Sequence, residues 1–214
     1  MASRAEIIPP LAKLFDTLPN SVDVIDRELA AAGLRVRLPR GRGVGAVSAL
    51  DLTHLAFALT GRRVVRGAAQ EVESISSLPL IGGRCLREQE VEAFPEPVFL
   101  DEGAELTPKG IIEGTWSQRY PRELLPMAPT FGRSVAEIIQ RLPDLERLPG
   151  LEGVFLLEVV VSWEPLTARI EFRHGVYMFI INFGGTGELL EGRPQFTFRY
   201  TQNFIGKISS ILNG

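Results

Sequence analysis

The residues best suited to chemistry in this sequence are seven arginines that fall between positions 35 and 66. A single acid, Asp51, accompanies them in that stretch. A guanidinium group stays charged at physiological pH, and its planar set of N–H donors matches the oxygens of a phosphate. The stretch therefore predicts contact with a polyanion through its arginines, which are Arg35, Arg37, Arg40, Arg42, Arg62, Arg63 and Arg66.

Charge is unevenly divided along the chain. The 214 residues have a formal net charge of −3. Residues 1–67 contribute +4, from ten Lys and Arg against six Asp and Glu, whereas residues 68–214 contribute −7, from 13 against 20. A basic part joined to an acidic part is typical of a DNA-binding head on a body with another role.

Residues for metal or nucleophilic chemistry are few. The two histidines, His54 and His174, lie far apart, and no HExxH or CxxC spacing is present. His54 is predicted to be structural or a surface residue. The single cysteine, Cys85, cannot form an intramolecular disulfide, which favours a reducing, intracellular setting. We therefore predict no metal ion, no other cofactor and no enzymatic activity.

Two glycine-rich motifs and one pair of acids have structural interpretations. The GRGVG motif at 41–45 lacks the GxGxxG spacing of a dinucleotide-binding turn. The GGTG motif at 184–187 lies between two β-rich runs and is predicted to be a hairpin turn. Glu158 and Glu171, on neighbouring predicted strands, are interpreted as exposed carboxylates of a sheet and not as a catalytic pair.

Two short helices precede the arginines and must position them. Apolar spacing predicts a first helix over 10–18, started by Pro9 and Pro10 because proline fits the first turn of a helix. Ser21 is predicted to cap a second helix over 22–32, which Gly33 ends in the left-handed conformation. Two short helices joined by a tight turn predict a helix-turn-helix pair.

The arginines themselves are predicted on a strand, a turn and a helix start. Residues 34–38 alternate apolar side chains with Arg35 and Arg37, which predicts a strand with the arginines on its solvent side. Residues 39–45 contain three glycines and a proline, so a turn is predicted with Arg40 and Arg42 at its tip and a return strand over 46–47.

Two further helices are predicted after this turn. Ser48 and Asp51 form a variant of the capping box that begins a third helix over 49–60, ended by Gly61. A fourth helix is predicted next, with Arg62, Arg63 and Arg66 at its beginning. Cations are unfavourable at a helix N-terminus, so this cluster indicates a negatively charged partner.

The rest of the chain predicts a different architecture. Residues 74–110 contain four prolines and no sustained periodicity, so an irregular connection or a set of short elements is predicted. A helix is predicted over 133–142, stopped by Pro143, and a terminal helix over 202–212 is predicted to cover a sheet. Four β-rich runs form that sheet, namely VFLLEVVV, LTARIEF, VYMFIINF and QFTFRY.

The fold class predicted from these elements is α+β. Residues 1–73 are predicted to be a winged helix-turn-helix domain, residues 74–110 an irregular connection, and residues 111–214 a small α+β domain with an antiparallel sheet for dimerisation or partner binding. The N-terminal residues contain no apolar run of signal-peptide length, and no stretch is long enough to span a bilayer. We therefore expect a soluble, cytoplasmic protein without membrane contact.

The sequences RELAAAGLRVRL (27–38) and PRGRG (39–43) resemble winged helix-turn-helix DNA-binding domains of the MarR and MerR kind. The resemblance covers about a quarter of the chain and implies that helix 22–32, including Arg27, enters the major groove. It implies that Arg40 and Arg42 reach phosphates or a minor groove. The sequence departs from the pattern in its acids, because Asp23, Asp26 and Glu28 lie on or near the face that would meet DNA.

These acids shift the predicted contact from the helix to the arginines of the strand and wing. The resulting hypothesis is a sequence-specific DNA-binding protein, a transcription regulator of the type carried by prophages, acting as a homodimer on double-stranded DNA. One alternative is a phage-type small terminase subunit or assembly component with a larger ring. Another is an adaptor whose winged helix binds RNA polymerase or a second regulator.

Overall fold

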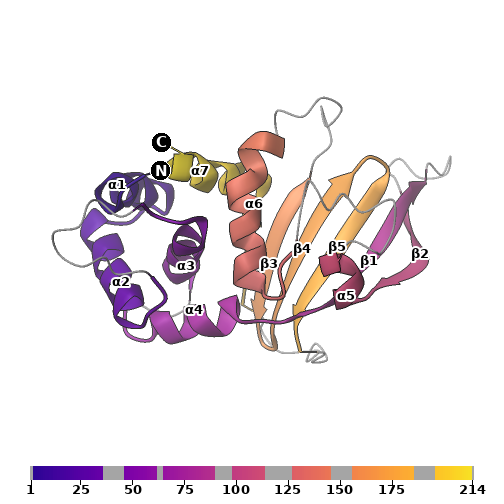
Figure 1. Cartoon of the computed structure of the whole chain (residues 1–214), viewed down its shortest axis with the longest axis horizontal. Helices are drawn as coiled ribbons and strands as arrows, with labels where there is room; N and C mark the ends of the chain where they lie inside the picture. Colours follow the sequence, from indigo (N-terminus) through magenta and orange to yellow (C-terminus); the bar gives the residue numbers. More distant parts are fainter. Residues whose placement is uncertain are drawn as a thin grey trace.

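The structure of the chain is a computed structural model, which describes residues 2–35, 46–61, 65–89, 98–113, 127–145, 156–185 and 196–213. Within these ranges the fold is α+β, with helices at one end and an antiparallel sheet at the other (Figure 1). The order of elements is α1 (Arg4–Leu14), α2 (Pro19–Ala31), α3 (Ala49–Thr60), α4 (Ala68–Ser76), β1 (Leu80–Gln89), β2 (Val98–Leu106), α5 (Pro108–Glu113), α6 (Phe131–Leu145), β3 (Leu157–Trp163), β4 (Leu166–His174), β5 (Tyr177–Gly184), β6 (Thr197–Thr201) and α7 (Gln202–Asn213).

The sheet has the strand order β2-β1-β5-β4-β3-β6, and all neighbours are antiparallel. Period-two alternation gives it a buried and an open face. On β4, Ala168, Ile170 and Phe172 are buried, whereas Arg169 is exposed. The buried face packs against helices, because Phe131 of α6 contacts Phe183 of β5 with ring centroids 5.3 Å apart. The four predicted β-rich runs are therefore confirmed as β3 to β6.

Of the two alternatives predicted for residues 74–110, the irregular connection is wrong, because the region contains regular elements. Residues 80–89 and 98–106 form the strands β1 and β2, and β1 pairs with β5 across the sheet. Two glycines, Gly82 and Gly83, interrupt the apolar alternation of β1, so its local pattern is weak. It pairs with β2, the next strand in the chain, on one side and with β5, at least ninety positions later, on the other; the local sequence does not identify the distant partner.

The GGTG motif does not make the predicted hairpin turn. Gly184 ends β5, and the next strand in the chain, β6, pairs with β3 at the other side of the sheet. β4 and β3 therefore lie between β5 and β6 in the sheet, although both flanking runs are strands as predicted. Two other turns do join neighbouring strands, one at Glu164-Pro165 between β3 and β4 and one at His174-Gly175 between β4 and β5.

The first helix begins earlier than predicted, and its prolines lie inside it. Ser3 and Glu6 form a capping box, in which the Ser3 backbone N–H donates to Glu6 Oε2 over 2.6 Å. This cap starts α1 at Arg4, so Pro9 and Pro10 fall within the helix instead of opening it. The hydrogen bonds to Ser3 lower the pKa of Glu6, which keeps the capping carboxylate ionised.

Helices α2 and α3 follow the predicted pattern closely. α2 begins at Pro19 with Leu18 as its N-cap residue, three positions before the predicted cap Ser21. Gly33 follows it with φ +77, as predicted for a left-handed residue. α3 has the predicted bounds and the predicted capping box, with the backbone N–H of Asp51 donating to Ser48 Oγ over 3.1 Å.

The N-terminal and C-terminal helices share one core with the sheet. The ring of Phe57 on α3 stacks on Phe131 of α6, with centroids 5.4 Å apart. The hydroxyl of Tyr200, at the end of β6, donates to the carbonyl of Ala56 over 2.9 Å and also bonds to Thr60. Helices of the predicted first domain therefore pack directly on helices and strands of the predicted third domain.

The last two helices differ from their predictions in detail. α6 continues through Pro143 to Leu145, whereas the sequence predicted a stop at that proline. α7 lies against α6 and α1, with Ser209 Oγ donating to the Ile139 carbonyl over 2.6 Å. Figure 1 shows α7 beside α1 at one end of the molecule. α7 also contacts the sheet at β6, where the Phe204 ring stacks on Tyr200 with centroids 5.0 Å apart, as predicted for a helix that covers the sheet.

Candidate nucleic-acid interface

Helix α2 presents an exposed stripe with side chains suited to base contacts. Asn20, Val24, Arg27 and Ala31 are spaced four, three and four positions apart, so they share one helix face. All four are exposed, and the side chain of Arg27 is 69% exposed. Asn and Arg hydrogen-bond to purine edges in the major groove, and small apolar side chains contact the thymine methyl group. α2 lies at the outer edge of the helices in Figure 1.

Helix α3 has no comparable face. Every residue from Leu52 to Ala58 is buried, as are Ala49 and Asp51. A helix with its side chains inside the core cannot enter a DNA groove without unfolding the surrounding core. Of α2 and α3, α2 is therefore the helix whose exposure suits base contact.

Two of the acids on α2 are compensated by arginines. Arg4, at the start of α1, donates from Nη2 to Asp23 Oδ1 and from Nε to Asp26 Oδ2, both over 2.5 Å. Arg27 pairs with Asp23, and Arg35 pairs with Asp26. We call these five residues the arginine–aspartate network. It holds three positive and two negative charges, so it carries one net positive charge.

The expectation that Asp23, Asp26 and Glu28 all lie on or near the face that meets DNA is wrong for Asp26. The side chain of Asp26 is only 2% exposed and lies beneath the helix surface. Asp23 is partly exposed but bonded to two guanidinium groups. Glu28 is exposed as expected. Most of the repulsion predicted for α2 is consequently offset within the protein.

Arg35 has a structural contact in this network. Its side chain is 10% exposed, because its guanidinium lies against Asp26. Burial lowers the pKa of Arg35, Asp51 opposes that effect, and Arg4 adds to it. Leu34 and Arg35 do not form the start of the predicted strand over 34–38, since they lie in a bend. A DNA contact by Arg35 stays a prediction.

The described residues on either side of the arginine-rich segment 36–45 both contact the N-terminal part of the chain. Before the segment, Arg35 is joined through Asp26 to Arg4. After it, Ala46 forms an antiparallel bridge with Ser3, and the Val47 N–H donates to the Ala2 carbonyl over 3.0 Å. The predicted return strand over 46–47 is thus a single bridge to the N-terminus. Arg37, Arg40 and Arg42 lie outside the described residues.

The third arginine group is only partly described. Arg62 and Arg63 lie outside the described residues, and Arg66 is exposed in the turn before α4. Gly67 occupies the N-cap position with φ +90, so α4 begins at Ala68, after the arginines and not with them. The structure brings Arg27 and Arg35 into one network and leaves Arg66 outside it.

The sequence did not identify Arg4, which pairs with both aspartates of the network. A signal for it was available, because Ser3 and Glu6 match the capping-box pattern and place Arg4 at the first position of a helix. The pairing itself joins residues 19 and 22 positions apart and has no local signature.

His54 is buried and joins the end of α2 to α4. Its Nδ1 lies 2.7 Å from the Leu34 carbonyl and its Nε2 lies 2.9 Å from Ser76 Oγ. A carbonyl can only accept, so Nδ1 carries the proton and Nε2 accepts from the Ser76 hydroxyl. The prediction of a structural His54 is therefore confirmed. Burial lowers the pKa of His54, against opposing effects of the Leu34 carbonyl and Asp51.

This lowered pKa predicts a loss of stability in mild acid. The unfolded chain takes up a proton on His54 near the ordinary pKa of about 6.5, whereas the folded protein resists it. The stabilisation is present above that pH and is lost as the pH falls through the lowered pKa of the folded state. We expect the free energy of unfolding, measured with urea, to decrease between about pH 7.5 and about pH 5.5. His54→Gln should flatten this dependence; an equally steep dependence in the variant would contradict the assignment.

Within the described ranges, no three His, Cys, Asp or Glu residues are placed to hold a metal ion. Nor does any described helix combine the length and apolar character needed to cross a membrane. Comparison of the chain with models of protein families, with curated proteins and with solved structures finds no match.

Proposed function

We propose that this chain binds double-stranded DNA through the exposed stripe of α2 and the arginines of residues 36–45, and acts as a transcription regulator. The observation that supports this most is the arginine–aspartate network. It offsets the acids of α2 and holds Arg35, which immediately precedes residues 36–45, beside that helix. In this proposal, α2 reads base edges and the arginines that follow Arg35 in the sequence bind phosphates.

The two parts have different tasks in this proposal. Arg40 and Arg42 supply affinity through phosphates, independently of sequence. Asn20 and Arg27 of α2 supply sequence preference through base edges. Helix α3, which follows the arginine-rich segment in the chain, is buried and serves as support.

Fluorescence anisotropy with labelled duplex DNA tests the proposal. Affinity for a pool of duplex fragments should fall about tenfold or more when Arg40→Ala and Arg42→Ala are combined, because two phosphate contacts are lost. The slope of log affinity against log salt should decrease by about 2.

A matched control removes two exposed cations elsewhere. Arg133 on α6 and Lys207 on α7 are exposed and lie outside the proposed interface. The combination Arg133→Ala and Lys207→Ala changes the net charge by the same amount and should leave affinity nearly unchanged. Equal losses for both pairs, or binding insensitive to salt, would overturn the proposed interface.

One observation favours an adaptor as the alternative function. Leu18, at the N-cap of α2, is 70% exposed, and Val24 on the same helix is also exposed. Apolar side chains on a helix surface suit a protein partner such as RNA polymerase. Absence of DNA binding together with a partner whose capture is lost in Leu18→Ser and Val24→Ser would select this function.

A further inference from the structure

The open face of the sheet carries a patterned set of polar side chains. Strand register places Thr197, Ser162 and Thr167 side by side on β6, β3 and β4, which makes a row of three hydroxyl groups. The next row along the strands contains Arg199, Val160, Arg169 and Asn182, from β6 to β5. Each row alternates with buried residues, so both rows lie on the face opposite the helices.

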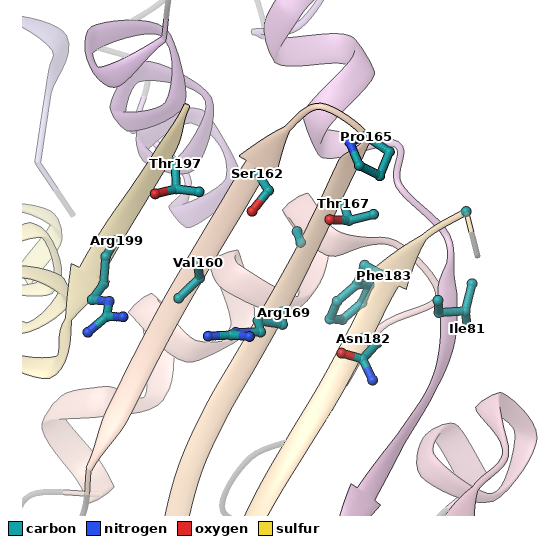
Figure 2. A pocket seen from close by; sticks show the side chains of 12 residues that line it. Ile81, Val160, Ser162, Pro165, Thr167, Arg169, Asn182, Phe183, Thr197 and Arg199 are labelled. Carbon is teal, nitrogen blue, oxygen red and sulfur yellow. The ribbon is translucent and has the colours of Figure 1, made fainter. Parts of the chain in front are cut away.

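The two arginines of the second row stand on either side of Val160. Both pair with this residue in the strand register, so one strand separates them and their Cα atoms are about 10 Å apart. Arg169 is 48% exposed and Arg199 is 58% exposed. Figure 2 shows both side chains on this face, flanking the smaller Val160.

Each arginine is held by one glutamate in a third row. Arg169 Nε lies 2.7 Å from Glu171 Oε1, and Arg199 Nη1 lies 3.4 Å from Glu158 Oε2. A guanidinium has five N–H donors, so one such contact leaves the others able to bind a ligand. The glutamates lie on the side of the arginines that faces away from the hydroxyl row. They orient the arginine side chains, and their negative charges partly offset the positive charges of the arginines.

These rows line a depression with a volume of about 440 Å³. Its lining includes Arg169, Arg199, Asn182 and the three hydroxyl residues, whereas neither glutamate borders it. The volume lies within the range of small-molecule sites. Convergent guanidinium groups with hydroxyl and amide donors match phosphate oxygens and the hydroxyl groups of a sugar.

We propose that this depression binds a small phosphorylated molecule of about sugar-phosphate size. The phosphate lies over Val160 between Arg169 and Arg199, and the polar body of the ligand lies along Ser162, Thr167 and Thr197. The site uses no residue of α2 or of the arginine-rich segment, so it is independent of DNA binding.

The test is a titration followed by NMR of the arginine Nε–Hε signals, with signals assigned by single Arg→Lys variants. The probes are inorganic phosphate, ribose 5-phosphate and uncharged ribose, each up to about 20 mM, well above the range of weak specific binding. Ribose 5-phosphate should shift the signals of Arg169 and Arg199 and bind more tightly than phosphate, and ribose should shift neither. No shift with ribose 5-phosphate would overturn the site.

Variants separate a binding site from ion pairs that only stabilise the sheet. Arg169→Ala and Arg199→Ala should each weaken ribose 5-phosphate binding about tenfold. Glu158→Gln with Glu171→Gln should strengthen binding severalfold, because two nearby negative charges are removed. Val160→Tyr fills the depression with a residue that strands accept and should abolish binding while both arginines remain. Unchanged affinity in Val160→Tyr would overturn the proposal.

A final arm distinguishes the source of the phosphate. A short single-stranded oligonucleotide offers the same chemistry on a polymer. It should compete with ribose 5-phosphate no better than inorganic phosphate does at equal phosphate concentration. Saturation by the oligonucleotide without binding of ribose 5-phosphate would overturn the small-molecule site and assign the face to nucleic acid.

Discussion

Replacing Asp26 by alanine is expected to lower the free energy of unfolding by about 3 to 5 kcal/mol. Asp26 is buried and bonds to Arg4 and Arg35, and the side chain of Arg35 is itself nearly buried. Loss of the carboxylate leaves a guanidinium inside the protein without its counter-charge. Removing one partner of a buried pair is costly for this reason, even where the intact pair adds little.

Urea unfolding of four proteins checks this expectation. Asp26→Asn keeps the shape and removes the charge, so it should lose most of the same stability as Asp26→Ala. Asp23→Ala is the matched control, since Asp23 also bonds to Arg4 but is partly exposed. Its cost should be about 1 kcal/mol or less. Equal losses of unfolding free energy for Asp23→Ala and Asp26→Ala would contradict the idea that burial makes Asp26 important for stability.

Replacing Gly132 by alanine is expected to cost about 2 to 3 kcal/mol. An added Cβ would lie 1.9 Å from Ser76 Oγ, 2.8 Å from Ser76 Cβ and 3.0 Å from Ser76 Cα. Rotation of the hydroxyl relieves only the first contact, so α6 must move away from the end of α4. The same movement disturbs the hydrogen bond between Ser76 and His54.

A second substitution tests whether this contact is the cause. Ser76→Gly removes the Oγ and Cβ atoms that the new methyl group would meet. The combination Gly132→Ala with Ser76→Gly should therefore be less destabilised than the sum of the two single variants, as measured by thermal unfolding. Strict additivity would contradict a direct clash between these two residues.

The sequence predicted the elements whose partners are local or whose pattern is strong. α3 has a capping box at its start and a glycine after its end, and both predicted bounds are observed. β3 to β6 have dense β-branched and aromatic runs, which identified them without knowledge of their neighbours. α7 was bounded almost correctly, although its packing against α6 could not be known from its own apolar face.

Other elements depend on contacts that sequence patterns do not report. β1 contains two glycines and two arginines, and it forms a strand because β2 and β5 pair with it on either side. α1 extends through two prolines because its capping box fixes an earlier start. β5 and β6 are consecutive strands in the chain but not neighbours in the sheet. Turn residues between two strands do not reveal the order of strands in the sheet.

The candidate interface was predicted in part. The basic character of residues 35–66 follows from composition alone, and the resemblance named Arg27 on the helix that is exposed. The compensation of Asp23 and Asp26 could not be predicted, since it requires Arg4 to approach from another helix. The polar rows of the sheet could not be predicted for the same reason. Arg199 and Arg169 lie in one row only because both pair with a residue of β3.

Hydrogen–deuterium exchange with and without duplex DNA tests the central claim most directly. Peptides that cover α2 and the following residues to Val47 should exchange more slowly when DNA is bound, because backbone and side chains there become covered. Peptides from β3, β4 and β6 should be unchanged. Absence of protection over residues 19–47, with protection elsewhere or with no DNA binding at all, would contradict a DNA interface built on α2 and the arginine-rich segment.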